Sequence, residues 1–121
     1  MIIAGLGFRK SASLDSLRDA FLRAGGAQAT ALATAEDKAG ATILRQLAAE
    51  RNLPIHAVPL AALAAQPVQN ISARVAALYG TGSLAEAAAL AAAGPGAQLL
   101  AARVTSQDRR ATAALAERIS E

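Results

Sequence analysis

The stretch IIAGLGFRKSASLDSLRDAFLRAGGAQATALAT, residues 2–34, decides the fold class. Residues 2–8 are apolar and predict a short buried strand, and Ser13 is a residue type that commonly opens a helix. Apolar residues then recur at the spacing of one helix face: Leu14, Leu17, Phe21 and Leu22. Gly25 ends this helix, and residues 28–34 form a second apolar run. The stretch therefore predicts a strand-helix-strand unit.

The next segment continues this alternation. Residues 36–38 are polar and predict a loop, and residues 53–58 predict a third strand. Between them, a second helix is predicted by an apolar stripe of Ile43, Leu44 and Leu47. Alternating strands and helices are typical of an α/β domain whose strands are at least partly parallel.

The second half of the chain is less regular. Residues 59–65 predict one helical turn, and residues 72–79 predict a short helix. Residues 83–93 predict a helix that is apolar nearly all round and is therefore buried, and residues 98–104 predict a strand. The last segment, residues 109–119, fits two structures, because its alanines favour a helix whereas its short connection to the preceding strand favours a hairpin.

The composition suits one compact domain. Hydrophobic residues make up 54% of the 121 residues, but 35 of them are alanine, and leucine, isoleucine and valine contribute only 26 side chains. We therefore expect a single three-layer α/β domain over residues 1–121, in which helices flank a mixed, largely parallel central sheet of about five strands.

The charge pattern bears on the class of ligand. Ten of the twelve basic residues are arginine, the net charge is +3, and no run of like charges occurs. The aromatic residues, which could stack on bases, are few: Phe8, Phe21 and Tyr79. A multiply anionic small ligand therefore fits this chain better than a nucleic acid does.

The absence of cysteine excludes a disulfide framework, a thiolate nucleophile and a sulfur-ligated metal. His56 is the only histidine, so we interpret it as a packed or surface residue and expect no metal and no cofactor. A Ser-His-Asp triad using His56 is compatible with the spacing, but nothing else supports it. Prolines and glycines interrupt the long apolar stretches, and positive charge follows the N-terminal apolar run instead of preceding it. We therefore expect a cytoplasmic protein that does not contact a membrane.

The segment Gly5-Leu6-Gly7 predicts a turn after the first strand. The turn would be either purely structural or an anion site completed by Arg9 and Lys10. A dinucleotide site would need a third glycine where Lys10 stands, and Arg9-Lys10-Ser11 lacks the glycine of a phosphate-binding loop. We therefore do not expect nucleotide binding.

Two further motifs have both a structural and a functional interpretation. Ser83 and Glu86 have the spacing of a capping box, but the sequence GTGS at residues 80–83 could also face a ligand at the positive end of a helix. Asp37 and Lys38 form a loop charge pair, which is usually only solvated. They follow the second strand, however, and thus lie at the edge where open α/β sheets bind ligands.

Taken together, these segments resemble the CobE proteins and the C-terminal domain of CbiG, from cobalamin (vitamin B12) biosynthesis, over nearly the whole chain. The resemblance is carried by the order and spacing of GLGFR at 5–9, EDK at 36–38, LPI at 53–55, GTGSLAEAAAL at 80–90, LLAAR at 99–103 and ATAALA at 111–116. This family often has cysteine where Phe8 stands and lysine where Arg103 stands, so no thiol role is carried over.

The resemblance implies that residues 111–116 form a strand, against their helical propensity. Charge, N–H donors and motif position, together with this resemblance, lead us to expect these ligand-binding residues: Gly5, Gly7, Arg9, Lys38, Gly82, Ser83, Glu86, Arg103 and Thr112. A precorrin is a partly apolar macrocycle rimmed by carboxylates, so cationic side chains and N–H groups around an apolar floor would suit it.

Three functions are compatible with the resemblance. The first is a carrier or accessory factor that binds a precorrin or corrinoid intermediate, a tetrapyrrole-derived polycarboxylate; because the chain begins with its own methionine, we expect a stand-alone protein of the CobE type. The second is a hydrolase that opens a precorrin lactone with loss of a two-carbon fragment, as the resemblance to CbiG implies, with Asp37 or Glu86 as general acid or base. The third is an interaction module without its own ligand, with other cobalamin-pathway enzymes as partners.

Overall fold

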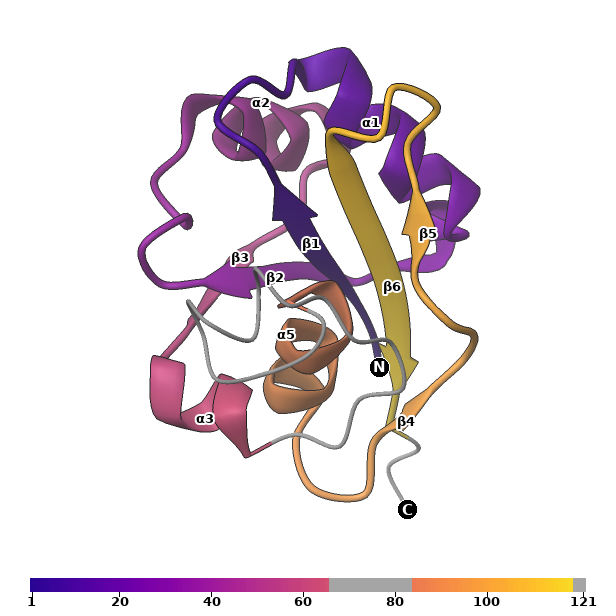
Figure 1. The fold of residues 1–121 in the computed structure, drawn as a ribbon. Coiled ribbons are helices and arrows are strands. Elements are labelled where there is room, and N and C mark those ends of the chain that lie inside the picture. The colour runs from indigo at the N-terminus through magenta and orange to yellow at the C-terminus, as the bar shows by residue number, and fades with distance from the viewer. Residues whose placement is uncertain (66–83, 119–121) are drawn as a thin grey trace.

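The computed structural model describes residues 1–65 and 84–118, which form a six-stranded sheet with helices on both faces (Figure 1). The first half contains β1 (Ile2–Phe8), α1 (Leu14–Arg23), a 3₁₀ turn (Gly26–Gln28), β2 (Ala31–Ala35), α2 (Thr42–Arg51) and β3 (Ile55–Val58). The other described elements are α3 (Leu60–Ala64), α5 (Leu84–Ala93), β4 (Gln98–Leu99), β5 (Val104–Thr105) and β6 (Ala111–Glu117). The helix expected over residues 72–79 lies outside the described residues.

The sheet is mixed, with the strand order β3-β2-β1-β6-β4 and with β5 also paired to β6. β1 is parallel to β2, and β2 is parallel to β3. β6 is antiparallel to β1, β4 and β5, so it alone among the described strands runs against the others. The predicted fold class, an α/β domain with a mixed and largely parallel sheet, is confirmed.

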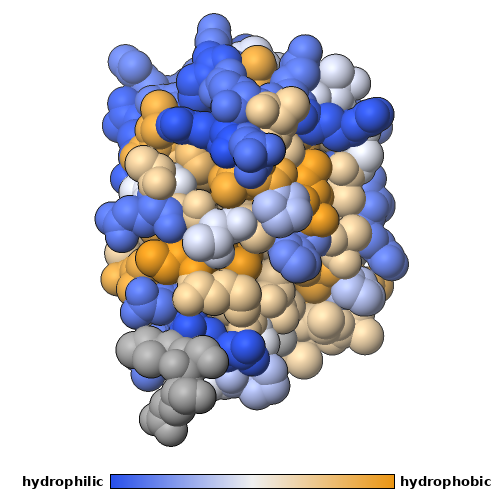
Figure 2. All heavy atoms as spheres, turned by 180° about the vertical axis from the view of Figure 1, so that it is seen from behind, coloured by the Kyte–Doolittle hydropathy of each residue, from blue (hydrophilic) through white to orange (hydrophobic). Residues whose placement is uncertain are grey.

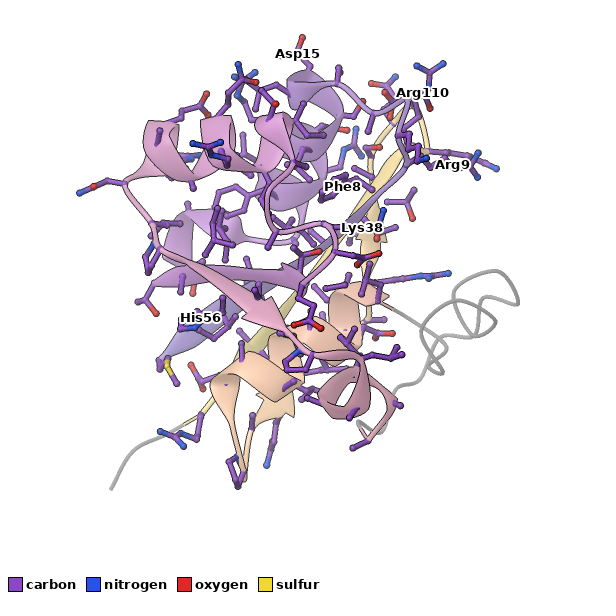
Figure 3. The ribbon with its side chains drawn as sticks, turned by 90° about the vertical axis from the view of Figure 1, so that its left-hand side faces the viewer. Phe8, Arg9, Asp15, Lys38, His56 and Arg110 are labelled. Atoms are coloured by element: carbon purple, nitrogen blue, oxygen red, sulfur yellow. The ribbon has the colours of Figure 1, made fainter. Side chains whose placement is uncertain are left out.

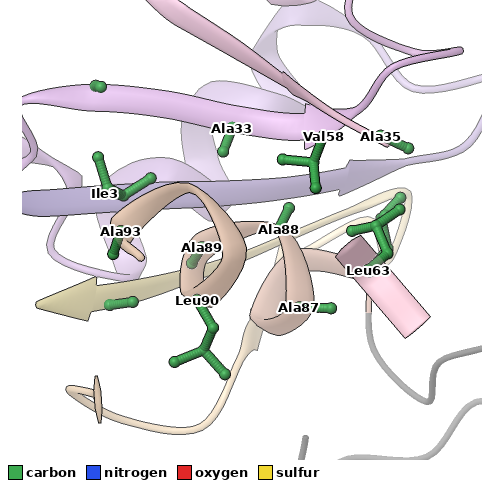
Figure 4. Packing of buried hydrophobic residues seen from close by; sticks show 13 residues of the cluster. Ile3, Ala33, Ala35, Val58, Leu63, Ala87, Ala88, Ala89, Leu90 and Ala93 are labelled. Atoms are coloured by element: carbon green, nitrogen blue, oxygen red, sulfur yellow. The ribbon is translucent and has the colours of Figure 1, made fainter. Parts of the chain in front are cut away.

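Two hydrophobic cores lie on opposite faces of the sheet. The core under α1 and α2 contains large, fully buried side chains: Leu6, Leu17, Phe21, Leu32, Leu44 and Leu47. The core under α3 and α5 is built mainly from alanine, together with Ile3, Val58 and Leu63 (Figure 4). Because alanine is small, α5 packs close to the sheet, as expected for a helix that is apolar nearly all round.

The ends of α1 and α2 follow from local residue types. The Ser13 hydroxyl accepts a hydrogen bond from the backbone N–H of Ser16, which confirms Ser13 as the residue that opens α1. α2 ends at Asn52, which adopts a left-handed conformation with φ of 57°. The prediction that Leu22 belongs to the buried face of α1 is wrong. Leu22 is 45% exposed, because the helix turns its Leu17 and Phe21 side toward the sheet.

The predicted turn at Gly5-Leu6-Gly7 is wrong, because these residues lie inside β1. β1 is paired with β2 on one side and β6 on the other, so its N–H groups belong to the sheet and not to an anion site. A Cβ atom on Gly5 would lie 1.9 Å from the carbonyl oxygen of Ala85 and 2.7 Å from the backbone nitrogen of Ala89. Gly5 therefore serves the close packing of α5 on the sheet.

The C-terminal third differs from the propensity-based expectation. Residues 98–104 do not form one strand but split into the two short strands β4 and β5, with Leu100 between them 47% exposed. Residues 111–117 form β6, so the helical propensity of their alanines is overridden and the strand that the family resemblance implied is confirmed. Small side chains suit β6 because α1 packs on one of its faces and α5 on the other.

None of the helices formed by residues 1–65 and 84–118 has the length and apolar character needed to cross a membrane.

Candidate functional site

A cleft opens at the carboxyl ends of β1 and β2, on the face of the sheet that α2 covers. Its volume is about 420 Å³, and its lining residues come from two segments: Phe8, Arg9, Lys10 and Ala12 after β1, and Asp37, Lys38, Ala41, Thr42 and Ile43 after β2. This is the edge at which open α/β sheets bind ligands. The sequence-predicted residues Arg9, Asp37 and Lys38 therefore meet around one cleft.

Lys38 is fixed at the inner wall of this cleft. Its Nζ atom donates a hydrogen bond of 2.9 Å to the carbonyl oxygen of Phe8 and lies 5.0 Å from the centroid of the Phe8 ring (Figure 3). The side chain is half-buried, and its ammonium group has three N–H donors. Lys38 is thus held in place by Phe8 at the end of β1, where its charge faces the same cleft as that of Arg9.

Arg9 and Lys10 form the outer, exposed wall of the cleft. The backbone N–H of Arg9 donates to the carbonyl oxygen of Arg110 at 2.9 Å, and Nη1 of Arg110 donates to the carbonyl oxygen of Ser11 at 3.3 Å. Within residues 1–65 and 84–118, neither the Arg9 nor the Lys10 side chain takes part in an ion pair. Hydrophilic side chains gather at the end of the molecule to which β1 points, as the view from behind shows (Figure 2).

The amino-terminal end of α2 also borders the cleft, through Ala41, Thr42 and Ile43. The cap residue Ala41 has no side chain that could accept a hydrogen bond from the first turn, and no other described side chain caps this end. An uncapped helix start carries a partial positive charge from its free N–H groups. It adds to the positive potential of Arg9, Lys10 and Lys38.

Hydrogen bonds to one carboxylate, that of Asp108, anchor the turn between β5 and β6. The carboxylate of Asp108 accepts hydrogen bonds from Ser106 Oγ at 2.6 Å, from Ser16 Oγ of α1, and from the backbone N–H of Arg110 at 3.1 Å. These bonds lower the pKa of Asp108 from 3.8 to about 2. The bond from Ser106 has the largest effect, followed by the bonds from Ser16 and from the backbone of Arg110. Asp108 therefore ties the turn that carries Arg110 to the start of α1.

A second carboxylate strengthens the same connection. Asp19 of α1 accepts a hydrogen bond of 2.7 Å from the backbone N–H of Gln107 and one of 2.8 Å from Nε of Arg23. The Gln107 bond first and the Arg23 bond second lower the pKa of Asp19. The sequence pattern did not indicate this cluster, although Ser106-Gln107-Asp108 before Arg109 has the composition of a polar turn.

The remaining predicted site residues do not line the cleft. Glu86 lies fully buried in the first turn of α5, on the opposite face of the sheet. Thr112 is on that face as well: it is paired with Gly7, and its Oγ1 donates to the Gly7 carbonyl oxygen at 3.4 Å. Arg103 is half-buried just before β5 and does not belong to the cleft lining.

Three further predictions concern single positions. Gly82 and Ser83, and with them the capping box at Glu86, lie outside the described residues. His56 is exposed on the edge strand β3 (Figure 3), which confirms the interpretation as a surface histidine. The cleft residues that the sequence prediction missed, above all Thr42 and Ile43, could have been found, because α2 begins at the sheet edge where Lys38 lies.

The comparisons with known proteins identify the family of this chain. The family described as "Cobalamin synthesis G C-terminus" matches residues 2–116. The chain belongs to this family. It is a protein of cobalamin biosynthesis. None of the curated protein sequences matches the chain significantly.

Three solved structures share the fold of this chain. CobE, a protein from the cobalamin (vitamin B12) biosynthetic pathway, is 36% identical with a TM-score of 0.87, and the match covers 100% of this chain and 92% of CobE. The cobalamin biosynthesis protein chiG from Agrobacterium tumefaciens is 33% identical with a TM-score of 0.74, over 99% of this chain and 100% of chiG. A cobalamin biosynthesis protein G homolog from Sulfolobus solfataricus, 19% identical, shares the fold with a TM-score of 0.70, over 95% of this chain and 36% of the homolog.

Proposed function

We propose that this member of the CbiG C-terminal family binds a precorrin or corrinoid intermediate in the cleft and acts as a carrier or accessory factor. The observation that carries the proposal is the cleft lining, which places the cations Arg9, Lys10 and Lys38 around apolar side chains. A precorrin presents the complementary surface, a partly apolar macrocycle whose rim bears acetate and propionate carboxylates. Charged hydrogen bonds to such carboxylates are stronger than neutral ones.

The chemistry of the lining supports binding more than catalysis. Hydrolysis of a lactone needs a positioned general base and a group that stabilises the developing oxyanion. Among the described residues that line the cleft, Asp37 is the only carboxylate, and Glu86 lies across the sheet. A carrier needs only the cations and the apolar floor.

A hydrolase is the second candidate, and the position of Asp37 at the exposed rim is the observation that favours it. Lys38 beside it could stabilise negative charge on an opening lactone. This candidate predicts that the Asp37→Asn variant binds the intermediate and does not convert it.

The test is to incubate the purified protein with pathway intermediates, separate protein from free ligand by gel filtration, and record absorbance and ligand mass. Co-elution of a coloured corrinoid with unchanged mass supports the carrier, and a changed mass supports the hydrolase. A protein that elutes without any corrinoid contradicts both and leaves the interaction module. A useful control is the Arg45→Met variant, which loses an exposed arginine of α2 outside the cleft lining.

A further inference from the structure

We infer that one end of the sheet is a docking surface for an acidic region of a partner protein. This surface, which we call the basic corner, consists of four exposed side chains: Arg9, Lys10, Arg109 and Arg110. The inference goes beyond the proposed function and does not require a ligand in the cleft. Its grounds are the placement of the four cations, their surroundings and the way in which their backbone is held.

The pairing of β1 with β6 brings the four cations together, although they come from opposite ends of the chain. The two strands are antiparallel, and the last residue of β1 lies opposite the first residue of β6. Arg9 and Lys10 therefore leave the sheet where Arg109 and Arg110 enter it. The backbone N–H of Arg9 donates to the carbonyl oxygen of Arg110 at 2.9 Å, and both side chains lie at this end of the sheet (Figure 3).

The charge of the basic corner is only partly neutralised by the described residues. None of the ion pairs formed within residues 1–65 and 84–118 includes any of the four cations. Asp108 attracts Arg110 and offsets part of the charge, while its oxygens accept hydrogen bonds within the turn. The eight other basic residues of the chain are outnumbered by its nine acidic residues, so the positive net charge of the protein comes from this corner.

Arg109 occupies a turn position that favours a different residue type. Its φ of 63° lies in the left-handed region, which glycine and asparagine adopt more readily than arginine. Its side chain forms neither a hydrogen bond nor an ion pair with the described part of the chain. The stability lost at this position is therefore not regained by a contact of the side chain, which favours a role in binding.

The backbone of the basic corner is held in place by α1. Asp19 accepts a hydrogen bond of 2.7 Å from the backbone N–H of Gln107, and Asp108 accepts one from Ser16 Oγ. The turn that carries two of the cations is thus fixed before a partner arrives. Docking then costs only the ordering of exposed side chains, and charges on such a surface mainly accelerate association.

An acidic protein surface fits this corner better than a nucleic acid or an anionic membrane does. Single-stranded nucleic acids stack on exposed aromatic side chains, whereas Phe8 at the end of β1 is half-buried. Stable attachment to a membrane needs an apolar anchor in addition to basic residues. The large exposed hydrophobic residues of the described chain come from segments other than those that carry the four cations: Met1, Leu22, Leu60 and Leu100.

The position of the basic corner suits a partner that exchanges a ligand with the cleft. Arg9 and Lys10 belong both to the corner and to the cleft lining, so a docked partner lies at the mouth of the cleft. If the proposed function holds, an enzyme of the pathway that supplies or accepts the bound intermediate is the partner to test.

A short peptide of alternating glutamate and serine is the probe that locates the surface. Titrated into the full-length ¹⁵N-labelled protein, it should give saturable chemical-shift changes in the amides of residues 9–11 and 107–111, and salt should weaken them. The same peptide with glutamine in place of glutamate is the control and should give none. Shifts confined to other residues, or equal effects of both peptides, would overturn the inference.

Substitutions of Arg109 separate a binding role from a structural one. Arg109→Asn should weaken peptide binding about threefold, as expected for one exposed ion pair, while the melting temperature stays the same or rises. Arg109→Lys should bind like wild type, because it keeps the charge. Arg45→Gln, which removes an exposed arginine from α2, should also bind like wild type. A less stable Arg109→Asn protein with unchanged binding would show a structural role and refute the docking surface.

The partner is tested with purified enzymes of cobalamin biosynthesis, one at a time, on the immobilised protein in biolayer interferometry. At least one should associate with wild type about threefold faster than with Arg109→Asn, with little change in the dissociation rate and with no difference at high salt. If no enzyme associates, or if both proteins associate equally fast, the inference is wrong. Tighter binding of a single-stranded oligonucleotide or of phosphatidylglycerol vesicles than of any enzyme would also overturn it.

The two proposals fail in different ways. If a corrinoid co-elutes with the protein but no enzyme docks at the basic corner, the docking inference is wrong and the carrier function stands. If an enzyme docks there but no corrinoid co-elutes, the docking surface stands and the carrier function is wrong.

Discussion

Replacing Gly5 by alanine tests whether α5 depends on direct contact with the backbone of β1. The added Cβ would lie 1.9 Å from the carbonyl oxygen of Ala85, 2.7 Å from the backbone nitrogen of Ala89 and 2.9 Å from the Cβ of Ala89. None of these atoms belongs to a flexible side chain that could rotate away. The helix must therefore move off the sheet or the strand must bend.

The expected cost follows from these contacts. Extra methyl groups in a packed core typically cost about 1–3 kcal/mol, and here the clash is with backbone, so we expect about 3 kcal/mol. An unfolding entropy of about 2.1 cal/mol/K per residue gives about 0.25 kcal/mol/K for this chain, so the melting temperature should fall by about 12 °C. Chemical denaturation should show the same loss as a lower midpoint with an unchanged slope.

Gly40→Ala is the matched control. A Cβ there would meet no atom within 4 Å, and Gly40 does not have a positive φ. This substitution should leave stability unchanged or raise it by about 0.4–1 kcal/mol, because alanine restricts the unfolded chain. If Gly5→Ala melts within about 2 °C of Gly40→Ala, the reasoning about close helix packing is refuted.

The remaining predictions concern the cleft and the two carboxylates outside it. Corrinoid binding should weaken as salt rises, because exposed cations such as Arg9 are screened over a Debye length of about 8 Å at physiological ionic strength; affinity that is independent of salt would point to the apolar floor alone. Glu86→Gln should leave corrinoid affinity unchanged in a binding titration, because Glu86 lies on the other face of the sheet, and a folded variant with impaired binding would place the ligand there. The ionised form of Asp108 stabilises the fold above its ordinary pKa of 3.8, and this contribution is lost as the pH falls from 3.8 toward about 2. Asp108→Asn should therefore be less stable than wild type at neutral pH in denaturant titrations, and a difference that stays constant down to pH 2 would contradict the assignment.

The first half of the fold could be predicted because its signals are local. Ser13, the apolar face containing Leu17 and Phe21, and Asn52 each specify an element within a few residues of themselves. β6 could not be predicted from its alanines, because its conformation is set by pairing with β1, more than a hundred positions away in the chain. Gly5 was misassigned for a related reason: a glycine permits both a turn and a close approach, and only the position of α5 decides between them.

The candidate site could be predicted only in part. Lys38 was identified because it follows the second strand, at the edge where open α/β sheets bind ligands, and Arg9 was identified as part of an anion site after the first strand. The Asp108 cluster was missed because its partner Ser16 is 92 positions away, and no local pattern links the two. Glu86 was assigned from the motif at the start of its helix and Thr112 from a segment that carries the resemblance, and neither signal reveals on which face of the sheet a side chain lies.

The exposure of the cleft cations bears on the choice between carrier and enzyme. Ion pairs with exposed side chains such as Arg9 and Lys10 contribute about 0–1 kcal/mol each, so they favour a ligand that enters and leaves readily. The half-buried Lys38, which the Phe8 carbonyl holds in place, would give a bound carboxylate a firmer contact than these exposed cations do. One firm contact and several weak ones would suit a carrier that delivers an intermediate to another enzyme. A hydrolase would instead hold the reacting bond away from water, which the exposed rim of this cleft does not favour.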